Sequence, residues 1–270
     1  MREKTFPQKV LIKGAGDLAS GVAYRLWQAG FNIVMLELPN PRVVRRTVAF
    51  ASAVFDGEVE VEGVKGMLFR LSNTGGIGEA LAQRKIPVLV DPKGEWIETW
   101  QPNVLVDAIL AKKNTGTSLT QAPIVIGLGP GFTAGLDVHA VVETERGHNL
   151  GKVYYQGCAT PNTGDPGDIG GHTLKRLLRS PAEGKFLPLK EIGDIVSKGE
   201  VIAVVGDKEI KAEIDGLLRG LLYPGVSVIQ GLKVGDIDPR GSQINYRAVS
   251  DKARSVAGGV LEAILHLYHR

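Results

Sequence analysis

The segment from Val10 to Gly21 constrains the fold of this chain more than any other. A short apolar run, Val10-Leu11-Ile12, stops at Gly14-Ala15-Gly16, where an amphipathic pattern begins. Gly30 follows as a helix stop, and before it apolar residues recur every four positions at Leu18, Val22 and Leu26. This order predicts a buried strand, a tight glycine turn and a helix.

The glycine turn is a candidate anion site. Gly14 permits the tight turn, Gly16 lets a ligand approach the backbone, and the free amides of the helix face the same point. The residues expected to contact a phosphate there are Gly14, Ala15, Gly16, Asp17 and Leu18. The carboxylate of Asp17 would repel a pyrophosphate and could cap the helix amides itself. A purely structural turn therefore stays the alternative.

Two further features bear on a nucleotide at this turn. Glu37 ends the next apolar segment about 20 residues after the turn, where a ribose-binding acid belongs and where it favours NAD over NADP. Arg45 and Arg46 follow, either as solvated side chains or as a clamp on a second anion.

The N-terminal region alternates apolar segments and helical patterns, which predicts a Rossmann-like parallel sheet with helices on both faces. We expect this domain to span residues 1–118. Carboxylates at strand ends place Asp107, with Asn114 nearby, at the ligand-binding edge of the sheet. The further expected elements are a helix at 76–85 and strands at 31–36, 88–90 and 104–106.

A middle segment, 119–180, contains an apolar strand at 124–126 and a second glycine loop, Gly127 to Gly131. The backbone amides at Gly129 and Gly131 make this loop another ligand-site candidate. Pro130 removes one donor and prevents a dinucleotide-type helix from starting there, so a tight turn is the alternative.

A dense polar group follows this loop. If 137–143 forms a strand, Asp137, His139 and Glu143 lie on one face. His139, Glu143 and the nearby His148 are then candidates for acid–base or ligand-binding roles, with a satisfied polar face as the alternative. The group shows no familiar metal-ligand spacing, and we expect no metal.

Cys158, the single cysteine, excludes an internal disulfide and predicts a cytoplasmic protein. It precedes the glycine- and proline-rich stretch 161–167, which makes it a candidate nucleophile, although a lone cysteine is also a common small core residue. No Gly-x-Ser-x-Gly elbow accompanies Ser118, so the sequence gives hydrolysis by a catalytic triad no support.

The composition excludes several classes of partner. Thirty-two basic and 29 acidic residues nearly cancel, so no broad field attracts nucleic acid or a membrane surface. No apolar run approaches the roughly 20 residues of a membrane span, and Met1 to Lys9 lacks the apolar core of a signal peptide. The oligomeric state stays open, with a homo-oligomer among the alternatives.

The C-terminal third has a different character. Short β-rich segments fill residues 181–248, and residues 249–270 form one amphipathic helix pattern. The stretch Ile210 to Gly216 resembles the strand and turn after the attachment hairpin of biotinyl/lipoyl carrier domains. Aligned in this way, the modified lysine would fall at Val205, with Lys208 out of register. The resemblance therefore implies an unmodified hammerhead-like module.

Several motifs together resemble one family over nearly the whole chain. They are Lys13 to Ala19, Arg45 to Phe50, Val106 to Lys112, Gly127 to Phe132, Glu143 to His148, Pro161 to Gly164 and Gly235 to Arg240. They resemble the YqeB family, the accessory proteins of selenium-dependent molybdenum hydroxylases, which is similar in theme to the xanthine dehydrogenase accessory factors.

This resemblance implies a maturation role, with a molybdenum hydroxylase or its maturation proteins as partners. Combined with the glycine turn, it predicts an accessory protein that binds a small phosphate-bearing ligand. That ligand would be NAD, another nucleotide or the pyranopterin phosphate of the molybdenum cofactor. The alternatives are an NAD-dependent oxidoreductase, for which no Tyr-x-x-x-Lys pair is evident, and a non-catalytic scaffold that docks a partner enzyme.

Overall fold

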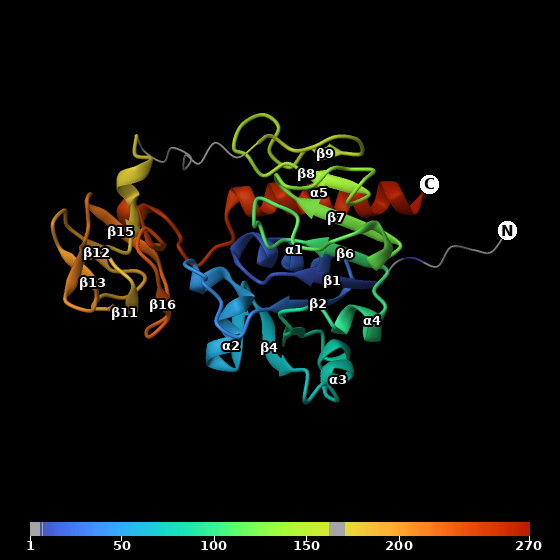
Figure 1. Ribbon diagram of the computed structural model, residues 1–270, viewed down its shortest axis with the longest axis horizontal. Helices are drawn as coiled ribbons and strands as arrows, with labels where there is room; N and C mark the ends of the chain where they lie inside the picture. Colours follow the sequence, from blue (N-terminus) through green and yellow to red (C-terminus); the bar gives the residue numbers. More distant parts are fainter. Residues whose placement is uncertain (1–5, 7, 162–170) are drawn as a thin grey trace. The chain divides into compact units, whose positions relative to one another are not determined.

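The computed structural model describes Phe6, residues 8–161 and residues 171–270 (Figure 1). The chain folds into two compact units. The first unit comprises residues 1–41, 49–162 and 249–270, and the second comprises residues 42–48 and 163–248. The second unit is therefore assembled from a short early segment and a long late one.

The first unit is built on one nine-stranded sheet with the strand order β3-β4-β5-β2-β1-β6-β7-β8-β9. All pairs from β4 across to β8 are parallel, and β3 and β9 add antiparallel edges. The strands are β1 (Lys9–Lys13), β2 (Asn32–Glu37), β3 (Glu58–Val61), β4 (Val64–Arg70), β5 (Ile86–Val90), β6 (Val104–Asp107), β7 (Ile124–Leu128), β8 (Ala140–Val142) and β9 (Val153–Tyr154). The helices are α1 (Asp17–Gln28), α2 (Ala53–Asp56), α3 (Ile77–Ala82), α4 (Trp96–Trp100) and α5 (Asp251–Tyr268), with short 3-10 turns η2 (Phe50–Ser52) and η3 (Leu119–Gln121).

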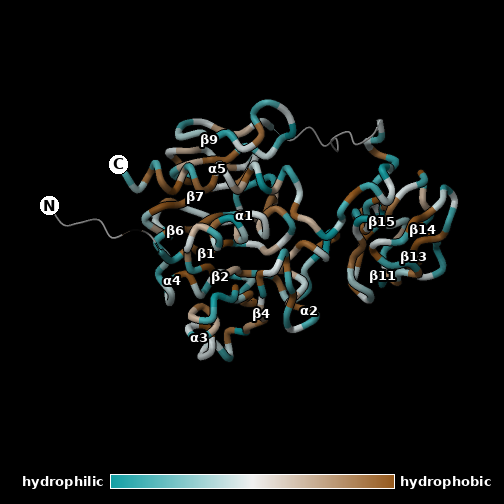
Figure 2. Tube along the Cα trace, turned by 180° about the vertical axis from the view of Figure 1, so that it is seen from behind, coloured by the Kyte–Doolittle hydropathy of each residue, from teal (hydrophilic) through white to brown (hydrophobic). Residues whose placement is uncertain are grey.

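The central strands are apolar because both faces of this sheet are covered, and Figure 2 shows the hydrophobic residues gathered along them. On one face Leu11, Leu105 and Val125 pack in a single cluster with Ile77 of α3 and Ile97 of α4. Alternate residues point to the opposite face, where α1 packs against α5. The expected mixed α/β class, with a large and mostly parallel sheet, is confirmed.

Strand β1 is the point at which the chain changes direction across the sheet. The chain passes from β1 to β2 on one side, and β6 later pairs with the other side of β1. Ligands of open parallel sheets bind outside the carboxyl ends of the strands at such a point. Here those ends are Lys13 and Asp107, which face each other in register.

Two elements differ from the expectation. The strand expected over 137–143 is reduced to β8, because Gly135 to Val138 forms a turn in which the Gly135 amide donates to the Val138 carbonyl. The helix expected over 76–85 is limited to α3, and β5 begins soon after it. By contrast, α1 runs as its apolar spacing predicts, and the chain after it turns at Gly30, whose φ is +94°.

The second unit contains two four-stranded sheets with the orders β10-β17-β15-β12 and β14-β13-β11-β16. All of their pairs are antiparallel. The strands are β10 (Leu177–Arg179), β11 (Gly184–Pro188), β12 (Ile195–Val196), β13 (Val201–Val205), β14 (Lys208–Lys211), β15 (Gly216–Leu221), β16 (Ser227–Val228) and β17 (Lys233–Asp238), with 3-10 turns η1 (Arg46–Val48), η4 (Leu174–Arg176) and η5 (Gly241–Gln243). Within the described part of the chain, no helix has the length and apolarity needed to cross a bilayer.

Candidate functional site

The turn between β1 and α1 combines one constrained glycine with one open glycine. Gly14 has a φ of +88°, and a Cβ atom there would lie 3.1 Å from the Ala108 carbonyl oxygen, so both conformation and space favour glycine. Gly16 is the N-cap of α1, and a Cβ atom there would meet nothing within 4 Å. The start of the helix is therefore open on the side of Gly16.

The first turn of α1 keeps its amides available. No side chain caps the helix in the described structure, and the first amides of a helix have no partner within the helix itself. The amides behind them are occupied, because Gly14 donates to the Leu36 carbonyl and Ala15 donates to the Glu37 carboxylate. In the described structure the first intrahelical bond runs from the Ser20 amide to the Gly16 carbonyl, so the donors left for an anion are the amides of Gly16, Asp17, Leu18 and Ala19. This set begins two residues later than the sequence suggested.

The Glu37 carboxylate binds the backbone of the turn. Its Oε2 accepts the Ala15 amide at 2.9 Å and its Oε1 accepts the Leu38 amide at 2.7 Å. Burial raises the pKa of Glu37, while the two amide bonds oppose that rise. Both oxygens have backbone partners in this structure, and a role for Glu37 toward a ribose stays a prediction.

Asp17 attracts a lysine of α5 that the sequence did not indicate. Helices α1 and α5 approach so closely that a Cβ atom on Gly21 would lie 2.7 Å from the Ala253 Cβ. This contact brings Lys252, the neighbour of Ala253, toward the first turn of α1. Burial and then the repulsion of Arg146 lower the pKa of Lys252, against the attraction of Asp17, Glu143 and Asp251. Lys252 and Asp17 therefore interact electrostatically at the contact between α1 and α5.

A second group of polar side chains lies where β1 and β6 end. Lys13 Nζ donates to Thr117 Oγ1 at 2.8 Å and to Gln121 Oε1 at 3.2 Å, and Thr117 Oγ1 lies 2.6 Å from Asp107 Oδ2. Asn114 Oδ1 accepts the Thr117 amide and so fixes the loop. Asp107 and Asn114 thus lie close together with Lys13 and Thr117, and a role for them toward a ligand stays a prediction.

The second glycine loop is closed by its neighbours. A Cβ atom on Gly129 would lie 2.5 Å from Thr144 Oγ1, and one on Gly131 would lie 2.6 Å from the Lys113 backbone nitrogen. The Gly129 amide donates to the Val142 carbonyl. Close packing therefore accounts for these glycines, and the structure favours the tight-turn alternative.

Three of the polar side chains that follow this loop bind different parts of the backbone. Glu143 is fully buried and accepts the Thr144 and Glu145 amides and both the amide and the hydroxyl of Thr160. Burial alone would raise the pKa of Glu143, but these hydrogen bonds outweigh it and lower the pKa. Its role as seen here is to hold two loops together.

His139 and Asp137 likewise each accept a different backbone amide. His139 Nδ1 accepts the Val125 amide, and burial lowers the pKa of this histidine. Asp137 accepts the Thr133 amide, and His148 is exposed. Among the residues described, no three His, Cys, Asp or Glu side chains gather as a metal-ligand set.

Cys158 is exposed, and its sulfur lies 3.3 Å from Thr133 Oγ1. The structure describes the chain up to Pro161, so most of the glycine- and proline-rich stretch that made Cys158 a nucleophile candidate lies outside the described residues.

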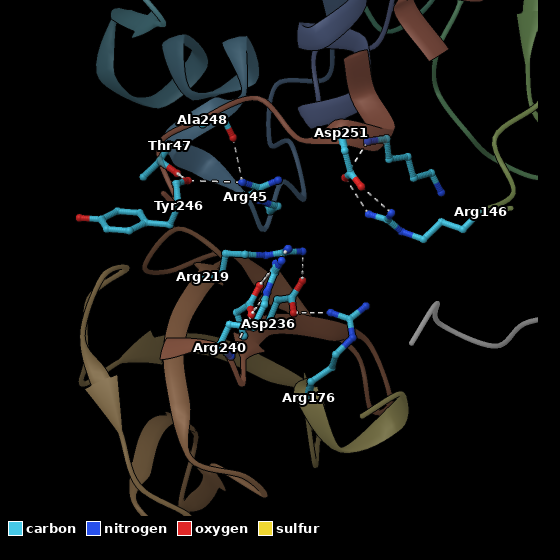
Figure 3. A network of polar contacts seen from close by, with 12 residues as sticks. Arg45, Thr47, Arg146, Arg176, Arg219, Asp236, Arg240, Tyr246, Ala248 and Asp251 are labelled. Carbon is cyan, nitrogen blue, oxygen red and sulfur yellow. Dashed lines mark hydrogen bonds and ion pairs between the residues drawn. The ribbon is translucent and has the colours of Figure 1, made fainter. Parts of the chain in front are cut away.

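Arg45 and Arg46 belong to the second unit. Arg45 donates to the carbonyls of Tyr246 and Ala248 (Figure 3). Arg46 donates to the Leu221 carbonyl. Each arginine therefore binds backbone of its own unit.

The same unit holds a buried ion-pair network around Asp236 and Asp238 that sequence reasoning missed (Figure 3). Asp236 pairs with Arg176 at 2.7 Å and Arg219 at 2.9 Å, and Asp238 pairs with Arg240 at 2.8 Å. Burial would raise the pKa of Asp236, but the attraction of the surrounding cations lowers it. The signal was present, because two carboxylates two positions apart share a strand face.

The chain is 54% identical over 264 residues to "Uncharacterized protein YqeB" of Escherichia coli (strain K12), a match that covers 97% of this chain and 48% of that protein. This chain therefore spans about half the length of the curated relative that it matches. The similarity supports assignment of the chain to the YqeB family, in agreement with the sequence motifs. No protein-family model matches the chain.

Two solved structures align over most of the chain. The apo ectoine utilization protein EutE (DoeB) from Ruegeria pomeroyi aligns at 11% identity over 86% of each chain, with a TM-score of 0.24. A succinylglutamate desuccinylase/aspartoacylase from Rhodobacter sphaeroides aligns at 13% identity over 80% of this chain and 61% of that chain, also with a TM-score of 0.24. TM-scores at this level do not establish a shared fold.

Proposed function

We propose that this chain binds a phosphate-bearing ligand at the Gly14–Gly16 turn and serves in the maturation of a selenium-dependent molybdenum hydroxylase. The observation that carries the binding site is the uncapped start of α1, which faces open space at Gly16. The resemblance of the sequence motifs to the YqeB family supports the maturation role. The ligand would be a nucleotide or the pyranopterin phosphate of the molybdenum cofactor.

Two features of the site favour an anion despite Asp17. Lys252 attracts the Asp17 carboxylate, so this carboxylate opposes a phosphate less than it would alone. The turn also lies at the carboxyl end of β1, where the strand order reverses direction and where open parallel sheets bind their ligands.

The strand orders support a more specific fold type for each of the two units. The order β5-β2-β1-β6-β7-β8, with β1 at the reversal, supports a Rossmann-like first unit. The two four-stranded antiparallel sheets of the second unit support a hammerhead-like module. The β13–β14 hairpin pairs Val205 with Lys208, so its turn carries no lysine to modify.

The binding site is tested by Gly16→Asp. An aspartate at this N-cap places its own carboxylate over the amides of α1, which stabilises the helix by about 0.5 kcal/mol and blocks an anion. We expect calorimetric titration with NAD, ADP and molybdenum cofactor released anaerobically from a hydroxylase to show binding of one of them to the wild type. The Gly16→Asp variant should lose that binding while unfolding at the same or higher urea concentration.

The matched control is Gly78→Asp. Gly78 lies exposed in the first turn of α3, and a Cβ atom there would meet nothing within 4 Å. This variant introduces the same charge at another helix start of the same unit. Equal binding by wild type and Gly16→Asp, or no binding of any ligand by wild type, would remove the proposed site.

A further inference from the structure

We propose that three cations of the second unit, Lys233, Arg219 and Arg240, form a binding site for the phosphate group of a small ligand. This cation row lies beside Asp236 and Asp238 of β17, and Figure 3 shows Arg219 and Arg240 next to Asp236. The site is separate from the glycine turn of the first unit and does not depend on a ligand there.

Two carboxylate oxygens hold the cation row together. Asp236 Oδ2 accepts Arg219 Nη2 at 2.9 Å and Lys233 Nζ at 3.4 Å. Asp238 Oδ2 accepts Arg240 Nη2 at 2.8 Å and Arg219 Nη1 at 3.4 Å. Because each oxygen is shared by two cations, the Arg219 guanidinium is joined to Lys233 through one carboxylate and to Arg240 through the other.

A β-bulge places Arg219 in the cation row. Leu218 of β15 pairs with Ile237 of β17. The next pair is Gly220 with Asp236, so Arg219 is an additional residue on β15. Bulges re-aim a side chain and are frequent next to active sites. In this position the Arg219 guanidinium reaches both carboxylates of β17.

The cation row carries more positive charge than its carboxylates neutralise. Among the described residues, salt bridges join four cations, with Arg176 as the fourth, to these two carboxylates. Burial would raise the pKa of Asp236, but the surrounding cations lower it. Cations this close repel one another where solvent is limited. A phosphate monoester, with a charge of about −1.5 to −2 at neutral pH, matches the excess.

Spare N–H donors remain in the cation row for the oxygens of a ligand. Lys233 has three donors, and within the described part of the chain Asp236 accepts one of them. Arg219 has five, of which the carboxylates accept two, and its Nε is buried without an acceptor among the residues described. Solvent reaches both ends of the row, since the side chains of Lys233 and Arg240 are 38% and 52% exposed. A phosphate can therefore enter from solvent and accept from the Lys233 ammonium beside Arg219.

The experiment titrates inorganic phosphate by calorimetry into the full chain carrying Gly16→Asp, so that the site proposed for the first unit is blocked. Lys233→Met removes the ammonium and gives up a contact of 3.4 Å with Asp236. We expect this variant to bind phosphate about tenfold more weakly. Acetate, with a single charge, should bind more weakly than phosphate.

The matched control is Lys185→Met. Lys185 is an exposed lysine on β11 of the same unit, and its ammonium donates to Ser227 Oγ rather than to a carboxylate. This variant removes the same charge outside the cation row, so its phosphate affinity should be unchanged. Urea unfolding of both variants shows whether either substitution has altered the fold.

A second measurement uses the wild-type chain and does not depend on the folding of a variant. The Nε of Arg219 is buried, which protects its hydrogen from exchange with solvent and makes the 15N–1H resonance observable. Phosphate bound at the cation row should shift this resonance. Acetate at the same concentration should shift it less.

The outcomes separate this site from the site proposed for the first unit. No phosphate binding by the Gly16→Asp chain, equal affinity of Lys233→Met and Lys185→Met, or an unmoved Arg219 resonance would each overturn the cation row as a binding site. None of these results would contradict the site at the glycine turn. Acetate binding as tightly as phosphate would contradict the assignment to a phosphate group.

Discussion

The two glycine loops of this protein look alike in sequence and differ in what surrounds them. Both follow a buried strand of the same sheet, β1 in one case and β7 in the other. At the first loop, Gly16 faces open space at an uncapped helix. At the second, Gly129 and Gly131 press against Thr144 and Lys113. A glycine can therefore leave room for a ligand in one loop and let two segments of backbone meet in the other.

The contrast extends to the glutamate associated with each loop. Glu37 accepts two amides at the first loop, and burial raises its pKa. Glu143 accepts three amides and a hydroxyl near the second loop, and these bonds lower its pKa despite its burial. The second loop is closely packed against its neighbours, whereas the first leaves space at an uncapped helix start.

The largest effect is expected from Gly131→Ala. The φ of Gly131 is +110°, and the new Cβ would meet the Lys113 backbone at 2.6 Å, so the variant should lose about 2–4 kcal/mol of unfolding free energy in urea. Gly135→Ala is the control, because its φ of +88° is also positive while nothing lies within 4 Å of the new Cβ. Equal losses for the two variants would show that the close approach carries no energy.

Glu143→Gln should destabilise the protein by about 2 kcal/mol at neutral pH, because an amide cannot accept all of the bonds that the carboxylate accepts. Since the folded state lowers the pKa of Glu143, its contribution is present above the ordinary pKa of 4.5 and is lost as pH falls through the lowered value. Urea unfolding against pH should show a shallower acid loss in the variant. Glu145→Gln, which removes an exposed neighbouring charge, should keep the wild-type slope.

The smallest effect is expected from Glu37→Gln, which should change the free energy of unfolding by no more than about 1 kcal/mol. The variant loses one amide hydrogen bond, but it also no longer buries a charge, and the two effects offset each other. The raised pKa of Glu37 gives a pH dependence of the opposite sign. The folded protein holds this proton more tightly, so wild-type stability falls as pH rises from 4.5 through the raised value. The Glu37→Gln variant should not show this decrease in stability with rising pH. If the decrease persists in the variant, Glu37 and Glu143 do not have opposite pH dependences.

Local pattern predicted most of the first unit. The apolar runs at β1, β2, β5, β6 and β7 were recognisable because central parallel strands are buried on both faces. The spacing of α1 and its stop near Gly30 followed from helical periodicity. The strand expected over 137–143 was too long, because a turn ending at Val138 depends on hydrogen bonds that composition does not reveal.

The candidate site was predictable only in part. The position of the β1–α1 turn and of Asp107 followed from strand ends, since parallel strands end at one edge. Lys13 and Thr117 lie 104 residues apart in sequence, and their contact depends on the pairing of β1 with β6. Lys252 interacts with Asp17 of the first turn of α1 only because α5 packs on α1.

The sequence by itself determined a strand, a glycine turn and a helix start, because these depend on residues within a few positions of one another. Only the tertiary structure decided which glycine loop is open. Whether a Cβ atom would meet solvent or a neighbouring backbone depends on segments distant in sequence, such as Lys113 beside Gly131 and Ala108 beside Gly14. The open space at Gly16 is a property of the packed sheet and helices.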